Sequence, residues 1–138
     1  MSGTHTRAAL VTGASRGIGR AIAIRLSQDG FAIAVNYAGN AAKAAEVVRE
    51  IAATGGRALA LQADIADPSA VERLFDEAAN AFGGIDVVVN SAGVLTMLPI
   101  AEADVAAFDA LFATNTRGTF NVLGQAARRL PDGGQGPA

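Results

Sequence analysis

The segment Thr12–Gly19, which reads Thr-Gly-Ala-Ser-Arg-Gly-Ile-Gly, limits the fold of this chain more than any other feature. The apolar run Ala8–Val11 precedes it directly, and residues 17–28 follow it with an apolar residue at every fourth position. A short apolar run bounded by glycine is typical of a buried strand, and a period near four is typical of an amphipathic helix. We therefore expect a strand, a glycine-rich turn and a helix. The expected apolar side of that helix consists of Ile18, Ile22 and Leu26.

A strand, a glycine-rich turn and a helix form the arrangement that holds the phosphates of a dinucleotide. Gly13 would allow the tight turn, Gly17 a close approach of the backbone to pyrophosphate, and Gly19 close packing of helix on strand. The alternative is an ordinary glycine-rich turn, but the position between strand and helix favours phosphate binding. The expected cofactor-binding residues of this segment are Gly13, Ser15, Arg16, Gly17, Ile18 and Gly19.

Apolar runs and helical patterns alternate along the rest of the chain. The expected strands are Ala8–Val11, Phe31–Val35, Ala58–Gln62 and Val87–Val89. The expected helices cover 17–28, 41–54, 68–82, 105–112 and about 116–130, the last with Val122, Leu123, Ala126, Ala127 and Leu130 as its apolar side. Such alternation predicts an α/β fold, a three-layer Rossmann-type parallel sheet. Residues 1–138 should form a single domain, with 131–138 as a flexible tail rich in proline and glycine.

Composition excludes several classes of function. The net charge of −2 argues against a nucleic-acid-binding surface. The absence of cysteine excludes disulfides, thiol nucleophiles and cysteine-based metal sites, and the scattered carboxylates predict no metal site. No stretch approaches the roughly 20 apolar residues that span a membrane, so we expect no membrane partner and a cytoplasmic protein.

Asn90-Ser91-Ala92-Gly93, after the fourth expected strand, adds a second motif to the first. Together they resemble the short-chain dehydrogenase/reductase family, and most of all the NADPH-dependent 3-oxoacyl carrier-protein reductases. The resemblance runs from about residue 6 to 134 but covers only the N-terminal half of a family member. It implies an incomplete NADP(H)-binding Rossmann domain, truncated after about four strands in the order 3-2-1-4. Full-length relatives are oxidoreductases that transfer hydride between NADPH and a carbonyl or alcohol.

The resemblance implies further cofactor contacts. Asp64 and Ile65 match an acidic–apolar pair that contacts the adenine ring, although Asp64 could serve only to cap a turn. Asn90, Ala92 and Gly93 match the family signature that lines the cofactor and steadies the central sheet. Ser91 departs from that signature, which has a second asparagine there.

The end of the second strand favours NADP(H) over NAD(H). An acidic residue there would bind the ribose 2′-hydroxyl of NAD, but this chain has Asn36 and Tyr37, and no carboxylate before Glu46. Arg16 could pair with a 2′-phosphate, since a guanidinium group suits phosphate geometry. The alternatives are a solvated Arg16 and, for Tyr37, either stacking near the adenine or covering the sheet edge.

Little of the family's catalytic set of Asn, Ser, Tyr and Lys has a match. Asn115 matches the asparagine, with a backbone-bonded residue at a helix kink as the alternative role. The only tyrosine and the only lysine, Tyr37 and Lys43, lie six residues apart instead of forming Tyr-x-x-x-Lys. Because the reaction needs a positioned proton donor, we expect negligible reductase activity from this chain alone.

Two other interpretations remain open. The chain could be a non-catalytic nucleotide-binding or interaction module, and a different Rossmann enzyme such as a methyltransferase is the weaker choice because it would not explain Asn115 together with 90–93. The apolar strand 87–90 would form an unpaired edge, which invites association. We therefore expect either a homo-oligomer or a complementing fragment as partner.

Overall fold

The structure is a computed structural model that describes residues 6–132. Four parallel strands form one sheet in the order β3-β2-β1-β4, as the resemblance implied. The strands are β1 (Ala8–Thr12), β2 (Ala32–Tyr37), β3 (Ala58–Gln62) and β4 (Val87–Asn90). The helical segments are α1 (Gly17–Gln28), α2 (Ala41–Ala53), α3 (Pro68–Phe82), α4 (Val105–Phe112), η1 (Ala113–Gly118) and α5 (Thr119–Arg129). Most of the expected flexible tail, residues 133–138, lies outside the described residues.

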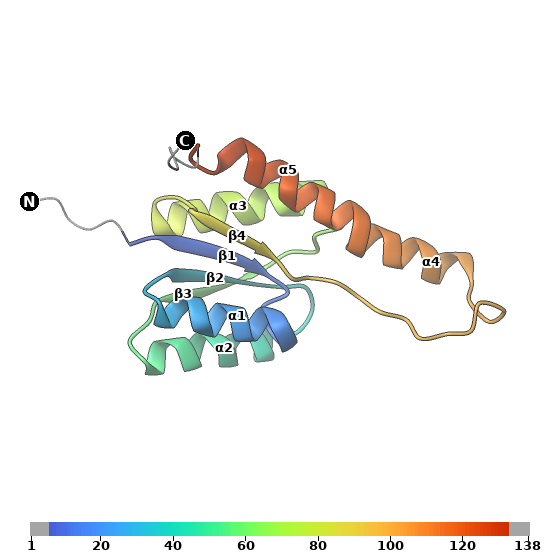
Figure 1. The fold of residues 1–138 in the computed structure, drawn as a ribbon, viewed down its shortest axis with the longest axis horizontal. Coiled ribbons are helices and arrows are strands. Elements are labelled where there is room, and N and C mark those ends of the chain that lie inside the picture. The colour runs from blue at the N-terminus through green and yellow to red at the C-terminus, as the bar shows by residue number, and fades with distance from the viewer. Residues whose placement is uncertain (1–5, 133–138) are drawn as a thin grey trace, which may run out of the picture.

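The chain forms three layers, with α1 and α2 on one face of the sheet and α3 and α5 on the other (Figure 1). Successive residues of β1 serve opposite faces, because side chains alternate along a strand. Ala8 and Leu10 pack with α3 and α5, whereas Ala9 and Val11 pack with α1 and α2. All five residues of β1 are buried, which explains why four of them are apolar; the fifth, Thr12, is polar.

The buried side of α1 differs from the expected one. Gly19, Ala23 and Ser27 are buried, whereas Ile18 is 76% exposed and Ile22 and Leu26 are only partly buried. Small residues face the sheet because α1 lies very close to it. The sequence prediction ranked positions by hydrophobicity, and this ranking fails where close packing requires small side chains.

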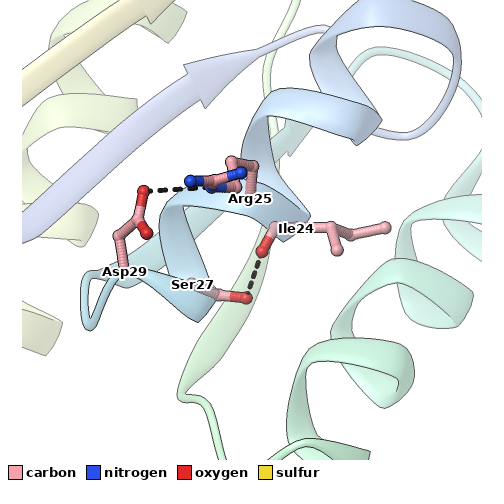
Figure 2. Close-up of polar contacts among 4 residues, drawn as sticks. All are labelled: Ile24, Arg25, Ser27 and Asp29. Atoms are coloured by element: carbon pink, nitrogen blue, oxygen red, sulfur yellow. Dashed lines mark hydrogen bonds and ion pairs between the residues drawn. The ribbon is translucent and has the colours of Figure 1, made fainter.

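The last turn of α1 satisfies its polar groups locally (Figure 2). Ser27 Oγ donates to the carbonyl of Ile24 at 2.7 Å, which lets this hydroxyl lie buried. Arg25 Nε donates to Asp29 Oδ2 at 3.3 Å, an exposed i,i+4 ion pair. The helix ends before Gly30, whose φ of +97° turns the chain toward β2, and Phe31 N donates back to Leu26 O at 3.1 Å.

The two expected C-terminal helices form one continuous helical stretch. The π-helical segment η1 joins α4 to α5, so the chain does not leave the helix near residue 116. Within η1, Gly118 packs against Ile65, where an added Cβ would lie 2.6 Å from Ile65 Cγ1. Of the expected apolar side of α5, Val122 and Ala126 are buried and Leu130 packs against the core. The other two members, Leu123 and Ala127, are exposed, because only a narrow stripe of α5 contacts the sheet layer.

Candidate functional site

The carboxyl ends of β1, β2 and β4 border a cavity of about 840 Å³, the position where open α/β sheets bind ligands. All of the expected cofactor residues except Asn90 line it. These are Gly13, Ser15, Arg16, Gly17, Ile18, Gly19, Asn36, Tyr37, Asp64, Ile65, Ala92 and Gly93. The fold thus brings together residues that lie up to 80 positions apart in the sequence.

The first turn of α1 offers unpaired amides to this cavity. No side chain caps α1, whereas Asn40, Asp67 and Asp104 cap α2, α3 and α4. Among residues 6–132, no acceptor bonds the amides of residues 17–19. Uncapped amides at a helix N-terminus form a ready anion-binding group, because the helix dipole adds partial positive charge there.

Asn36 at the end of β2 holds the glycine-rich loop in place. Its Oδ1 accepts from Gly13 N at 3.2 Å, and its carbonyl accepts from Ala14 N at 2.9 Å. Its Nδ2 donates to the carbonyls of Leu61 and Ala63 at 3.2 and 3.3 Å. The buried Asn36 amide is therefore occupied by backbone, and its contribution to the cavity is to fix the start of the loop.

Thr12 joins the glycine-rich loop to the segment after β4. Its Oγ1 donates to Asn90 Oδ1 at 2.6 Å and accepts from Ser91 N and Ala92 N at 3.0 and 3.1 Å. Asn90 Nδ2 in turn donates to Thr119 Oγ1 at 3.0 Å. Asn90 therefore lies behind the cavity wall and connects β4 to α5, which accounts for its absence from the lining.

Because Gly13 has no side chain, the glycine-rich loop packs directly against the segment after β4. The loop and this segment together form one wall of the cavity. The φ of Gly13 is +60°, a conformation that favours glycine, and an added Cβ would lie 2.7 Å from Ala92 Cα. Gly17 also has a positive φ, +57°, but an added Cβ there would meet no atom within 4 Å. The loop is thus crowded toward the sheet and open toward the cavity.

Asp64 and Ile65 border the cavity beyond the end of β3. Asp64 Oδ1 accepts from Ala66 N at 3.0 Å, so the turn-capping role is present while the residue also lines the cavity. Ile65 is buried and packs against Gly118. The pair places an apolar side chain and a carboxylate together in the cavity wall, a combination usual in small-molecule sites.

Asn115 lies in η1 and faces the segment after β4. Its Oδ1 accepts from Val94 N at 2.8 Å and its Nδ2 donates to Val94 O at 2.7 Å. Its own carbonyl accepts from Thr119 Oγ1 at 2.7 Å. Asn115 borders a second cavity, of about 580 Å³, next to Arg16, Gly93 and Val94. The backbone-bonded role is thus present, and it ties the helical stretch to the mouth of the site.

The cavity also contains residues that the sequence analysis did not assign to it. These are Ala38, Gly39, Asn40, Lys43, Ala63, Ser91, Val94 and Thr114. Lys43 is named in the sequence analysis only because it does not form a Tyr-x-x-x-Lys pair with Tyr37. In a parallel sheet, however, a helix that follows a strand begins at the carboxyl end of that strand. The position of Lys43 in the first turn after β2 was therefore a usable indication.

The residues present fit a dinucleotide. The volume lies within the range of about 300–1,000 Å³ usual for cofactor sites. The uncapped amides of α1 and the exposed Arg16 suit phosphate, and Asp64 and Ile65 suit a base. Among the described residues, no group of three or more His, Cys, Asp or Glu could hold a metal ion. In the same part of the chain no helix has the length and apolarity to cross a membrane.

Comparison with known proteins identifies the family to which this chain is similar. The model of the family described as short chain dehydrogenase matches residues 7–137. The short chain dehydrogenase/reductase AacuN of Aspergillus aculeatus is 46% identical over 92% of this chain and 48% of its own length. The 3-oxoacyl-[acyl-carrier-protein] reductase FabG of Staphylococcus aureus is 42% identical over 91% of this chain and 51% of its own length.

A solved structure gives the same result for the fold. The crystal structure of a short chain dehydrogenase from Burkholderia cenocepacia in complex with NADP superposes with a TM-score of 0.89 at 45% identity. The match covers 94% of this chain and 53% of that one. The chain thus spans about half the length of the relatives that it matches.

Proposed function

The chain belongs to the short chain dehydrogenase family, and from this premise we propose that it is the NADP(H)-binding part of an oxidoreductase. The complete enzyme would transfer hydride between NADPH and a carbonyl or alcohol. The observation that carries the proposal is the cavity at the start of α1, where uncapped helix amides, an open glycine-rich loop and Arg16 meet. A relative with this fold was crystallised with NADP, which supports the choice of ligand.

Each wall of the cavity would have its own task. The amides of residues 17–19 would bind pyrophosphate, because they have no acceptor among residues 6–132. Asp64 and Ile65 would border the adenine, and Ala92 and Gly93 would border the nicotinamide half. The reduced nicotinamide would supply the hydride. Asn36 and Thr12 would keep the glycine-rich loop in its binding conformation through their hydrogen bonds to the backbone.

Charge favours NADP(H) over NAD(H). Arg16 is exposed at the cavity and has no ion-pair partner among the described residues. β2 ends in Asn36 and Tyr37, so no carboxylate stands where one would bind a ribose 2′-hydroxyl and repel a 2′-phosphate. The preference for NADP(H) would therefore depend on the attraction between Arg16 and the 2′-phosphate, and on the absence of a carboxylate that would repel this phosphate.

These 138 residues alone would have negligible reductase activity. Tyr37 ends β2 and Lys43 lies in the first turn of α2, and the sequence contains no other tyrosine or lysine. Without a Tyr-x-x-x-Lys pair, the site has no phenol held as proton donor beside a substrate carbonyl. Asn115 would contribute to the proton path through its position at the mouth of the site. In this proposal the chain binds and orients the cofactor, and proton transfer depends on further residues.

The unpaired edge of β4 would bind a partner chain. β4 pairs only with β1 within the described chain, and its residues are half-buried. The exposed apolar residues Leu95, Met97 and Ile100 follow it. A second copy of this chain or a complementing fragment would cover this edge, and analytical ultracentrifugation of the purified chain tests the first of these. A single monomeric species at all concentrations would contradict self-association.

Calorimetric titration of the purified chain with NADPH and with NADH tests the binding proposal. We expect binding of both dinucleotides, with NADPH preferred. Arg16→Gln should weaken NADPH binding about tenfold and leave NADH binding nearly unchanged, since a charged hydrogen bond contributes about 1.5 kcal/mol or more. Absence of binding for both dinucleotides would refute the proposal, and equal affinities would refute the preference.

A further inference from the structure

The short segment between β3 and α3 contains two cavity-lining residues, Asp64 and Ile65, and side chains from a distant part of the chain hold its backbone. Asn121 Nδ2 donates to Ile65 O at 2.9 Å, and Arg117 Nε donates to Ala66 O at 3.1 Å. The two donors lie 56 and 51 residues further along the sequence, in the helical stretch formed by η1 and α5. This stretch therefore determines how one wall of the cavity is placed.

A single peptide group connects Asn121 to the carboxylate of Asp64. The carbonyl of Ile65 and the N–H of Ala66 belong to the same peptide unit, and in a trans peptide they point in opposite directions. The carbonyl accepts from Asn121, and the N–H donates to Asp64 Oδ1 at 3.0 Å. The orientation of this peptide sets the direction of the Asp64 carboxylate, and Asn121 fixes the peptide from its opposite end.

The side chain of Asn121 reaches this peptide because the helix lies very close to the segment. Gly118 precedes Asn121 by three residues, and a Cβ added to Gly118 would lie 2.6 Å from Ile65 Cγ1. Asn121 is half-buried, so its hydrogen bond competes less with water than the bond of the exposed Arg117. Asn121 does not line the cavity, so its influence on a ligand would pass through the Ile65–Ala66 peptide.

The Asp64 carboxylate can distinguish a donor from an acceptor on a base. Oδ1 already accepts from Ala66 N, but an ionised carboxylate has acceptor sites on both oxygens and has no donor. The 6-amino group of adenine can donate to such a group, whereas the 6-oxygen of hypoxanthine is an acceptor and would be repelled. Hydrogen bonds weaken steeply away from their preferred angles, so this distinction requires a carboxylate that is held in one orientation.

We propose that Asn121 is a positioning residue for base selectivity: it holds the Ile65–Ala66 peptide, and through it the Asp64 carboxylate, in the orientation that accepts from an amino-purine. The inference rests on the proposed function, in which Asp64 and Ile65 border the adenine, and extends it to a side chain outside the cavity. The hydrogen bond at the Ile65 carbonyl also polarises the N–H of the same peptide, which strengthens the bond from Ala66 to Asp64.

The test compares NADPH with its analogue in which hypoxanthine replaces adenine. Wild type, Asn121→Leu and the matched control Asn80→Leu are titrated with each ligand by calorimetry. Asn80 is exposed on α3 and lies outside the cavity lining. Wild type and the control should bind NADPH about tenfold more tightly than the analogue, the value of one hydrogen bond to a charged group. Asn121→Leu should weaken NADPH binding roughly three- to fivefold and change binding of the analogue less than twofold, so that the preference falls to about two- to threefold.

A second variant, Asn121→Asp, keeps the shape of the side chain and removes its N–H donor, so it should lose the preference as well. Thermal unfolding of each variant shows whether it is folded. A purely structural Asn121 would affect both ligands equally, so an unchanged preference in a folded Asn121 variant overturns the inference while the proposed function stands. Equal binding of the two ligands by wild type, or failure of both Asn121 variants to fold, also overturns the inference alone. If wild type binds neither ligand, the proposed function is overturned with it.

Discussion

Thr12→Val removes a hydroxyl that makes three hydrogen bonds and changes almost nothing else. Thr12 is fully buried, and valine has nearly the same shape. The substitution leaves Ser91 N and Ala92 N without the acceptor that lies at 3.0 and 3.1 Å, and Asn90 Oδ1 without its donor. It therefore breaks the connection between the glycine-rich loop and β4 while preserving the packing of β1.

The size of the effect follows from those partners. Each buried polar group left unpaired costs about 1–3 kcal/mol. Ser91 and Ala92 are only half-buried, so water can reach their amides in part, and the lower end of the range applies to each. We expect the free energy of unfolding to fall by about 2–3 kcal/mol, which lowers the melting temperature by roughly 10 °C for a chain of this size.

Urea unfolding followed by circular dichroism measures this change. The midpoint should fall by about 1–2 M at an unchanged slope, because the surface exposed on unfolding stays the same. Thr54→Val is the matched control, since the hydroxyl of Thr54 donates only to Ile51 O at 3.1 Å on an exposed residue. Its effect should stay within about 0.5 kcal/mol. If both variants unfold at the same midpoint, the connection through Thr12 does not stabilise the fold as argued.

Two further substitutions test the site itself. Gly19→Ala should abolish NADPH binding in calorimetry, because the new Cβ would collide with Gly13 O and displace the loop. The control variant Gly124→Ala should bind NADPH normally, since its new Cβ meets only the end of the Arg128 side chain. Retained NADPH binding by Gly19→Ala would contradict the packing argument. Asn115→Leu should raise the hydrogen-exchange rate of the Val94 amide about tenfold, since it removes the acceptor at 2.8 Å; an unchanged rate would show that this bond does not hold the segment after β4.

The parallel sheet could be foreseen from the residues themselves, because uniform apolar runs such as 87–89 alternate with helical periods. The strand order came from the family resemblance, and the glycine-rich turn indicated the position of the cavity. The side of α1 that faces the sheet could not be foreseen in this way. Ile18 is exposed at the cavity, whereas Gly19 and Ala23 are buried, because the distance between helix and sheet selects small residues there.

Two features of the site depend on three-dimensional contacts that have no sequence period. The π-helical segment η1 joins what the sequence predicts as two separate helices, and within it Gly118 packs on Ile65. Asn90 carries a family signature, which suggested a residue on the cavity wall. Its amide instead bonds Thr12 and Thr119 behind that wall. A motif indicates where a residue is needed, but not which of its neighbours it contacts.

The missing cap on α1 couples the ligand to the folding equilibrium. A helix whose first amides lack acceptors is less stable than its capped neighbours by about 1 kcal/mol, and a bound anion supplies what the chain does not. By mass action, a ligand present at 100 times its dissociation constant adds about 2.7 kcal/mol to the stability of the native state. The lifetime of this protein against heat and proteases is therefore a function of the concentration of its ligand, and a rise in melting temperature reports occupancy without any turnover.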